Sequence, residues 1–405
     1  MDASRAETRP PWSNLQKDLL ADIANRLDSR TEVLYFRGVC TTWRDAVPLP
    51  KTSSIPQPLE LPYPISPNPA LNPKFVGHFA LIENTVYCIQ PLNETSDNGR
   101  KKTPKSWLVN IEYSEEVGKV RYLDPFSPFW NRNLSGKVLN LLDYKVFEVS
   151  KVYNLQFVGT GENPENEISI HEMDSITIRK VVLSNDPFLV MAIHTDAELG
   201  IWKMTDNTWI NIDDGHEHSH YVDIAYHKGK FYAGDSMGHD ISVDFSLKIT
   251  EVLRPFSRGF SGGLAKYLVK SSGDLLLVHK YVDPEFHYAT DSESDSDFGG
   301  VDLDYPFYFQ VYKLNEEENR WRFVESLGDR AIILGYYGNF SVSAREFPGC
   351  KSNCIYFTDD SFVECDDKHP GYDAGLYDLK NHCAKPLSAA VGYSELFWPP
   401  PTWLK

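Results

Sequence analysis

This sequence of 405 residues has few cysteines, no long apolar run and no apolar segment at its start. Six cysteines are too few for a scaffold held by disulfides. No run of about 18 apolar residues occurs, so the sequence predicts no transmembrane helix. The start, MDASRAETRPPWS, lacks the apolar core of a signal peptide. We therefore expect a protein of a reducing compartment, the cytoplasm and/or the nucleus, with no membrane partner.

Positive charge is also scarce. The chain has 40 Lys and Arg against 57 Asp and Glu, which gives a net charge of −17. Contacts to phosphates need clustered Lys and Arg, so this balance argues against a nucleic-acid partner. Aromatic residues are abundant, with 22 Tyr, 22 Phe and 9 Trp, and this richness favours β structure.

The first fifty residues nevertheless carry helical patterns. Leu15, Leu19, Ile23 and Leu27 recur every four residues and predict one apolar helix stripe. A capping box at Ser29 and Glu32 marks a second helix start, and a further apolar repeat ends at Pro48. So short a module cannot bury its apolar residues alone, because domains below about 40 residues need a partner or a staple.

The order of residues in this module resembles an F-box, which we place at residues 12–47. The matching pieces are Leu15, Asp18-Leu19-Leu20, Ile23, Arg26-Leu27, Leu34, Phe36-Arg37, Val39-Cys40 and Trp43-Arg44. The sequence departs from the family pattern at Gln16, Ala24 and Asp28. The resemblance implies a Skp-family adaptor and a cullin complex as partners. The residues implied to bind the adaptor are Leu15, Asp18, Leu19, Leu20, Ile23, Leu27, Leu34, Val39, Cys40 and Trp43. The alternative is a helical hairpin packed on the main domain.

A proline-rich segment follows, with nine prolines between residues 48 and 73. Proline at this density excludes helix and central strand and favours an extended, semi-rigid spacer. We therefore assign residues 48–74 to a linker. The alternative is a PxxP ligand for another protein module.

Residues 75–405 consist of short apolar runs, rich in Val, Ile, Tyr and Phe, separated by turn residues. Phe188, Phe231 and Leu275 begin similar strands about 43 residues apart, a spacing typical of propeller blades. This region therefore predicts a mainly β fold, a β-propeller of about six to seven blades. A pair of large β-sandwiches is the alternative.

The C-terminal part of this region carries an ordered set of short motifs. They are Leu327–Ala331, Gly335, Ser341–Ala344, Phe347–Cys350, Asn353 and Ile355–Asp360. This set resembles the plant family with "domain of unknown function 295", the KIB-type β-propeller. That family's usual layout, an F-box before the propeller, implies the substrate receptor of a cullin–RING ubiquitin ligase with an unknown target protein. It implies a non-catalytic chain without cofactor or metal.

Other patterns suggest chemistry, each with a simpler alternative. Gly259–Gly263 fits the G-x-S-x-G nucleophile elbow, but a strand pattern follows where that motif needs a helix. His216, His218 and His220 alternate and would face a metal together if extended, whereas an exposed loop is the alternative. An acidic run at Asp291–Asp297 lacks the spacing of a calcium loop, and a basic run at Gly99–Lys105 is short for an import signal.

Cysteine and histidine near the C-terminus also suggest a zinc site. The set comprises Cys350, Cys354, Cys365, His369, His382 and Cys383. Only the first pair has the spacing of a zinc knuckle, so buried cysteines acting as small hydrophobic residues are favoured. The function hypotheses are therefore a ligase substrate receptor, a plain protein-interaction propeller, and an enzyme with its site at the propeller mouth.

Overall fold

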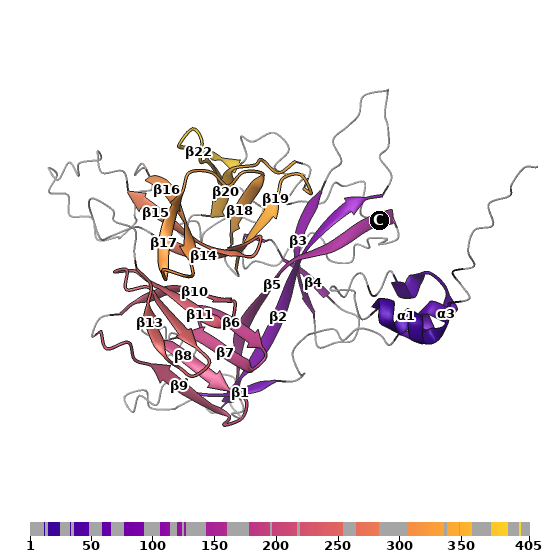
Figure 1. The fold of residues 1–405 in the computed structure, drawn as a ribbon, viewed down its shortest axis with the longest axis horizontal. Coiled ribbons are helices and arrows are strands. Elements are labelled where there is room, and N and C mark those ends of the chain that lie inside the picture. The colour runs from indigo at the N-terminus through magenta and orange to yellow at the C-terminus, as the bar shows by residue number, and fades with distance from the viewer. Residues whose placement is uncertain are drawn as a thin grey trace, which may run out of the picture.

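The computed structural model of the chain describes residues 12, 15–24, 33, 36–47, 59–65, 77–92, 106–113, 120–123, 125–126, 143–159, 178–194, 197–216, 219–253, 265–282, 307–335, 338–347, 349–358, 374–387 and 397. Two helices, α1 (Lys17–Ala24) and α3 (Thr41–Ala46), lie near the N-terminus, and the later part is built from strands (Figure 1). Neither of these helices has the length and apolar character to cross a bilayer. The prediction of a mainly β fold behind a small helical module is confirmed.

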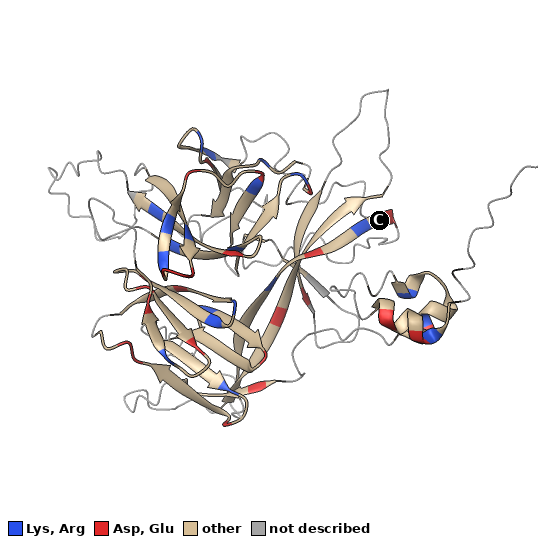
Figure 2. Ribbon diagram, viewed as in Figure 1, with Lys and Arg blue, Asp and Glu red and all other residues tan. Residues whose placement is uncertain are grey.

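Three successive groups of strands share one plan, in which four antiparallel strands follow one another in chain order. The first group consists of β6 (Lys180–Asn185), β7 (Phe188–Ile193), β8 (Leu199–Lys203) and β9 (Thr208–Ile212), and it continues the sheet of the preceding strands. The second group is a sheet of its own and consists of β10 (Tyr221–His227), β11 (Lys230–Asp235), β12 (Ile241–Asp244) and β13 (Ile249–Glu251). The third group consists of β14 (Ala265–Ser271), β15 (Asp274–Val282), β16 (Phe307–Asn315) and β17 (Arg320–Val324), and it is joined to the last strands of the chain. Repeated four-stranded units of this kind are propeller blades, and acidic and basic residues are scattered over their strands (Figure 2).

Tight turns fix the register of two blades. Lys228 and Gly229 have φ of 43° and 84°, and Ser272 and Gly273 have φ of 50° and 82°. Two successive residues with positive φ form the type I′ turn, whose twist matches that of the flanking strands, and glycine adopts this backbone without strain. The turns therefore join β10 to β11 and β14 to β15 with the shortest possible loops.

The first five strands are built around one long antiparallel pair. β2 (Gly77–Pro91) and β5 (Tyr144–Gly159) pair along their whole length, with a bulge between Val86 and Tyr87. β1 (Glu60–Pro62) pairs with the N-terminal half of β2, and β3 (Trp107–Tyr113) pairs with its C-terminal half, followed by β4 (Val120–Leu123). The β2–β5 pair therefore contributes to several cores, which contain Phe79, Val86 and Tyr87 respectively.

The last five strands continue the sheet of β14 but do not follow one another in chain order. From β14 outward they are β19 (Asn339–Ser343), β18 (Arg330–Leu334), β20 (Cys354–Thr358), β21 (Ala374–Asp378) and β22 (Cys383–Pro386), with β18 and β20 parallel. Phe397 from the C-terminal end is buried and lies 4.5 Å from Phe126 and 5.8 Å from Tyr356, ring centre to ring centre. The apolar C-terminal segment thus contributes at least this side chain to the propeller core.

The innermost strands of these sheets form a closed circuit. β5 pairs with β6, β6 contacts β10, β10 contacts β14, β14 pairs with β19, and β19 contacts β5 again. Figure 1 looks down the short axis of the molecule and shows these strands around its centre. A radial arrangement around a common axis defines a propeller, so that prediction is confirmed. The count of six to seven blades stays a prediction. β2 and β5 contribute to more than one core, so these strands cannot each be assigned to a single blade.

One buried carboxylate joins four strands of this circuit. Asp223 of β10 accepts hydrogen bonds from the backbone N–H of Leu268 on β14, at 2.7 Å, and from Nδ2 of Asn339 on β19, at 2.8 Å. Its other oxygen accepts from the N–H of Ile224 and pairs with the ammonium of Lys180 on β6. The Asp223 side chain is 3% exposed, so these contacts replace the water that the carboxylate has lost.

Replacing Asp223 by Ala should therefore destabilise the whole propeller. The substitution leaves the largely buried Lys180 ammonium and the Leu268 N–H without their acceptor, and removing one partner of a buried ion pair costs about 3–5 kcal/mol. Urea unfolding of the full chain, followed by tryptophan fluorescence, measures the loss. Asp206→Ala, at an exposed turn, is the control and should change the unfolding free energy by less than about 0.5 kcal/mol. Equal unfolding midpoints for the two variants would contradict the central role of Asp223.

Part of the segment assigned to the linker belongs to the propeller. β1 lies on the edge of β2, where a proline does not interrupt the hydrogen bonding of a central strand. Leu61 is fully buried and Ile65 is 5% exposed. The indole Nε1 of Trp209 donates to the carbonyl oxygen of Pro62 at 2.8 Å. Residues 59–65 are therefore anchored to the propeller, and the range 48–74 is not a spacer throughout.

A fragment that begins at residue 59 should consequently be more stable than one that begins at residue 75. The shorter fragment exposes the sites of Leu61 and Ile65, and each large apolar side chain contributes about 1.5–3 kcal/mol when buried. Circular dichroism during thermal unfolding compares the two fragments. Identical melting temperatures would show that β1 contributes nothing to propeller stability.

Candidate functional site

The helical module packs around its own small core. Leu20 is fully buried, and the side chains of Ala24, Phe36 and Val47 are 7–9% exposed. The rings of Phe36 and Trp43 lie 4.4 Å apart, and the Trp43 indole donates to the carbonyl oxygen of Trp12 at 3.0 Å. These contacts bring α1 and α3 together without using every apolar side chain of the module.

Four large apolar side chains among the described residues of the module are exposed, namely Trp12, at 60%, and three on or beside the helices. Leu19 is 48% exposed, Ile23 is 39% exposed and Val39 is 57% exposed. Leu19 and Ile23 stand four residues apart on α1, so they share one face of the helix. Leu20, next to Leu19, points into the core. The helix is therefore apolar on an inner face and on an outer one, and neighbouring apolar residues on a surface mark an interaction site.

The structure sorts the residues expected to bind an adaptor. Asp18, Leu19, Ile23 and Val39 are exposed, whereas Leu20 is a core residue. Leu15, Cys40 and Trp43 are partly buried. Leu27 and Leu34 lie outside the described residues. The resemblance to an F-box placed Leu19 and Leu20 in one adaptor-binding set, and only their burial separates a surface role from a core role.

Arg37 has a role that sequence reasoning missed. Its guanidinium donates to the carbonyl oxygen of Arg44 at 2.8 Å and also to that of Val47. Carbonyl groups at the C-terminal end of a helix lack partners within the helix, and a basic side chain satisfies them. Arg37 therefore terminates α3 and holds it in place.

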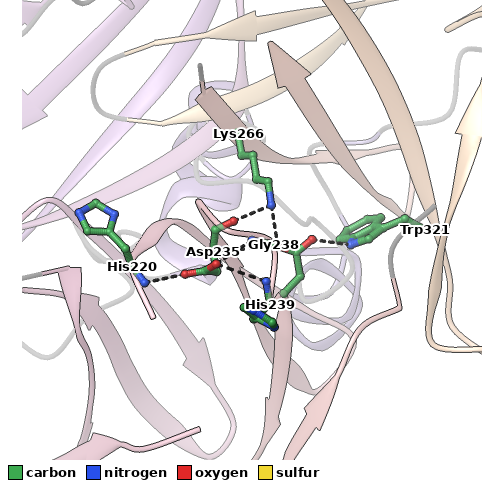
Figure 3. A network of polar contacts seen from close by, with 7 residues as sticks. His220, Asp235, Gly238, His239, Lys266 and Trp321 are labelled. Atoms are coloured by element: carbon green, nitrogen blue, oxygen red, sulfur yellow. Dashed lines mark hydrogen bonds and ion pairs between the residues drawn. The ribbon is translucent and has the colours of Figure 1, made fainter. Parts of the chain in front are cut away.

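A second candidate site lies on the propeller and begins with a buried polar network (Figure 3). Asp240 accepts hydrogen bonds from the Nζ of Lys266 on β14, at 3.2 Å, and from the indole of Trp321 on β17, at 3.0 Å. Both side chains of the Asp240–Lys266 pair are at most 6% exposed. The network thus fastens the β11–β12 turn of one blade to two strands of the next.

Asp235 organises the same turn from the other side. Its carboxylate accepts from the backbone N–H groups of His220 at 2.5 Å, Gly238 at 2.7 Å and His239 at 3.3 Å, as Figure 3 shows. Three N–H donors on one carboxylate hold the backbone around it in a single arrangement. The side chain of His239 is therefore presented from a rigid turn.

A cavity of about 520 Å³ opens beside this turn. The ring of His239 stacks on that of His216, with centres 4.4 Å apart and planes inclined by 24°. Of the three alternating histidines, His218 lies outside the described residues, and it is His239, from another turn, that lies against His216. The residues lining the cavity are Asp213, Asp214, Gly215, His216, His239, Ile241, Ile249 and Glu251.

Asp214 is held by its own loop. Partial burial raises the pKa of its carboxyl, but hydrogen bonds from the hydroxyls of Ser219, at 2.6 Å, and Tyr221, at 2.5 Å, outweigh burial. The pKa of Asp214 consequently lies below its ordinary value. A lowered folded-state pKa stabilises the fold above the unfolded pKa of about 3.9, and this stabilisation is lost as the pH falls through the folded value.

Tyr221→Phe should raise the pKa of Asp214, because one of its two hydroxyl donors is removed. The acid-induced loss of stability should then begin at a higher pH. The variant should also lose about 1 kcal/mol at neutral pH, a value reduced by the partial exposure of Asp214. Carboxyl carbon NMR titration gives the pKa, and Tyr226→Phe is the control. An unchanged Asp214 titration would contradict the assignment.

The cysteines near the C-terminus that the structure describes are buried or partly buried. Burial raises the pKa of the Cys350 thiol to about 12 and that of Cys354 to about 11, so both remain protonated near neutral pH. Among the described residues, no three or more His, Cys, Asp or Glu side chains are placed to hold a metal ion. The patterns outside the described residues are Gly99–Lys105, Gly259–Gly263, Asp291–Asp297, Cys365 and His369.

Together, the helical module and the radial sheets define an F-box protein with a β-propeller. A family model described as the KIB1-4 β-propeller matches residues 78–378, and the chain belongs to this family. It is 30% identical to the F-box protein SKIP23 of Arabidopsis thaliana over 410 residues, 97% of this chain and 95% of that protein. It is 27% identical to the F-box protein At2g17036 of the same plant, over 97% of this chain and 94% of that protein.

Proposed function

We propose that this chain is the substrate-recognition subunit of an SCF-type cullin–RING ubiquitin ligase. In this role the helical module binds a Skp-family adaptor, and the propeller holds a target protein for ubiquitin transfer. The chain itself contributes no catalytic group, because the other subunits carry out the transfer. It works in the cytoplasm, the nucleus or both.

The observation that carries this proposal is the exposed apolar face of α1. Leu19 and Ile23 remain uncovered although the module already has a core around Leu20. Two such side chains on one short helix gain free energy when a partner covers them, about 25 cal/mol for each Å² of apolar surface removed from water. The F-box relatives support the same reading, since similarity to them extends over the helical module.

Adaptor capture tests the proposal. The full chain, expressed with a plant Skp-family adaptor, should retain the adaptor on affinity purification. Leu19→Asp together with Ile23→Asp should weaken retention by more than about tenfold, because each change would place an unpaired carboxylate in an apolar contact, and burying an unpaired charge is costly. Both positions are exposed, so the module should remain folded.

The matched control makes the same kind of change on the propeller. Val158 is 39% exposed and Met204 is 45% exposed, and replacing both by Asp should leave adaptor capture unchanged. Undiminished capture by the Leu19 and Ile23 variant, with a folded module, would contradict the proposed adaptor surface. Failure of the unaltered chain to bind any adaptor would instead favour a plain interaction propeller.

A further inference from the structure

The cavity beside His239 lies at one edge of a blade. In an antiparallel blade, the start of β10, the β11–β12 turn and the end of β13 all reach the same edge, which is where the lining residues sit. Hydrogen bonds of Asp235 and Asp240 hold the β11–β12 turn in place (Figure 3). The cavity is therefore built on rigid backbone, as a specific binding site requires.

The charge of the cavity is negative. Its lining includes three carboxylates and no Lys or Arg. Asp214 is occupied by its own loop, but Asp213 uses only one oxygen, which accepts from the N–H of Gly215 at 2.9 Å. Among the described residues, no basic side chain pairs with Asp213 or Glu251. Two carboxylates at the cavity are therefore available to an external cation.

The lining also includes two flat imidazole rings and two apolar side chains. His216 and His239 present stacked imidazole rings, of which His216 is exposed. Ile241 is 3% exposed and Ile249 is partly buried. A planar aromatic surface next to free carboxylates suits a guanidinium group, which stacks through its plane and donates two parallel hydrogen bonds through its edge. A lysine ammonium has neither a plane nor a fork of donors.

We propose that this cavity binds an arginine side chain of the target protein. The guanidinium stacks against the exposed ring of His216, and its N–H groups donate to Asp213 and Glu251. The aliphatic part of the arginine lies against Ile241 and Ile249. This inference rests on the proposed function for its biological meaning, since it identifies the part of the target that the propeller recognises.

The test uses the full chain with histidine labelled for NMR. N-acetyl-arginine amide, added up to tens of millimolar, should shift the ring C–H signals of His216 and His239 in a saturable manner. The citrulline analogue, which is neutral and of the same shape, should bind at least about tenfold more weakly, because it lacks charge-assisted hydrogen bonds. The lysine analogue should also bind more weakly than the arginine compound.

Two variants complete the design. Asp213→Asn with Glu251→Gln should abolish the saturable shift, whereas Asp206→Asn with Glu325→Gln removes the same charge at exposed positions outside the cavity and should preserve it. Equal shifts from arginine and citrulline amides, or binding that survives the cavity variant, would overturn the proposal, and so would equal affinity for lysine. The test involves no adaptor, so its outcome is independent of whether the helical module binds one.

Discussion

The Asp223 carboxylate is the contact on which the propeller most depends. Four strands from three sheets meet around it, and each supplies a donor to its oxygens. Apolar packing fills the space between the sheets but has no direction. The Asp223 side chain supplies direction, because its oxygens accept hydrogen bonds at fixed positions. The polar contacts therefore fix how the strands are placed, and the apolar cores fill the space between them.

The helical module does not bury all its large apolar side chains. Its core around Leu20 consists of a few side chains, and it leaves Leu19 and Ile23 on the surface. A propeller buries its apolar residues between its own sheets, which surround an axis. So short a helical unit gains stability when a partner covers its apolar residues. In the proposed role, the propeller would hold the target and the helical module would dock onto the adaptor.

Strand periodicity and repeat spacing were sufficient to predict the propeller, since Val, Ile and aromatic runs alternate with turn residues such as Lys228-Gly229. The sites were harder. The four-residue repeat includes Leu19 and leaves out Leu20, yet Leu20 is the core residue and Leu19 is exposed, so the repeat alone does not tell an inward face from an outward one. His216 and His239 meet only because two turns reach the same blade edge. Asp223 resembles any acidic residue in a strand until its neighbours from β6, β14 and β19 are known.

The anchoring of β1 limits how far the two parts can separate. With Leu61 and Ile65 held on the propeller, the connection from the helical module shrinks to residues 48–58. About eleven residues span at most roughly 40 Å when fully extended. In the proposed ligase this short connection would keep a bound target at high effective concentration near the transfer machinery. Its length would also limit which lysines of the target the machinery can reach. The anchored strand would thus select which lysines of the target receive ubiquitin.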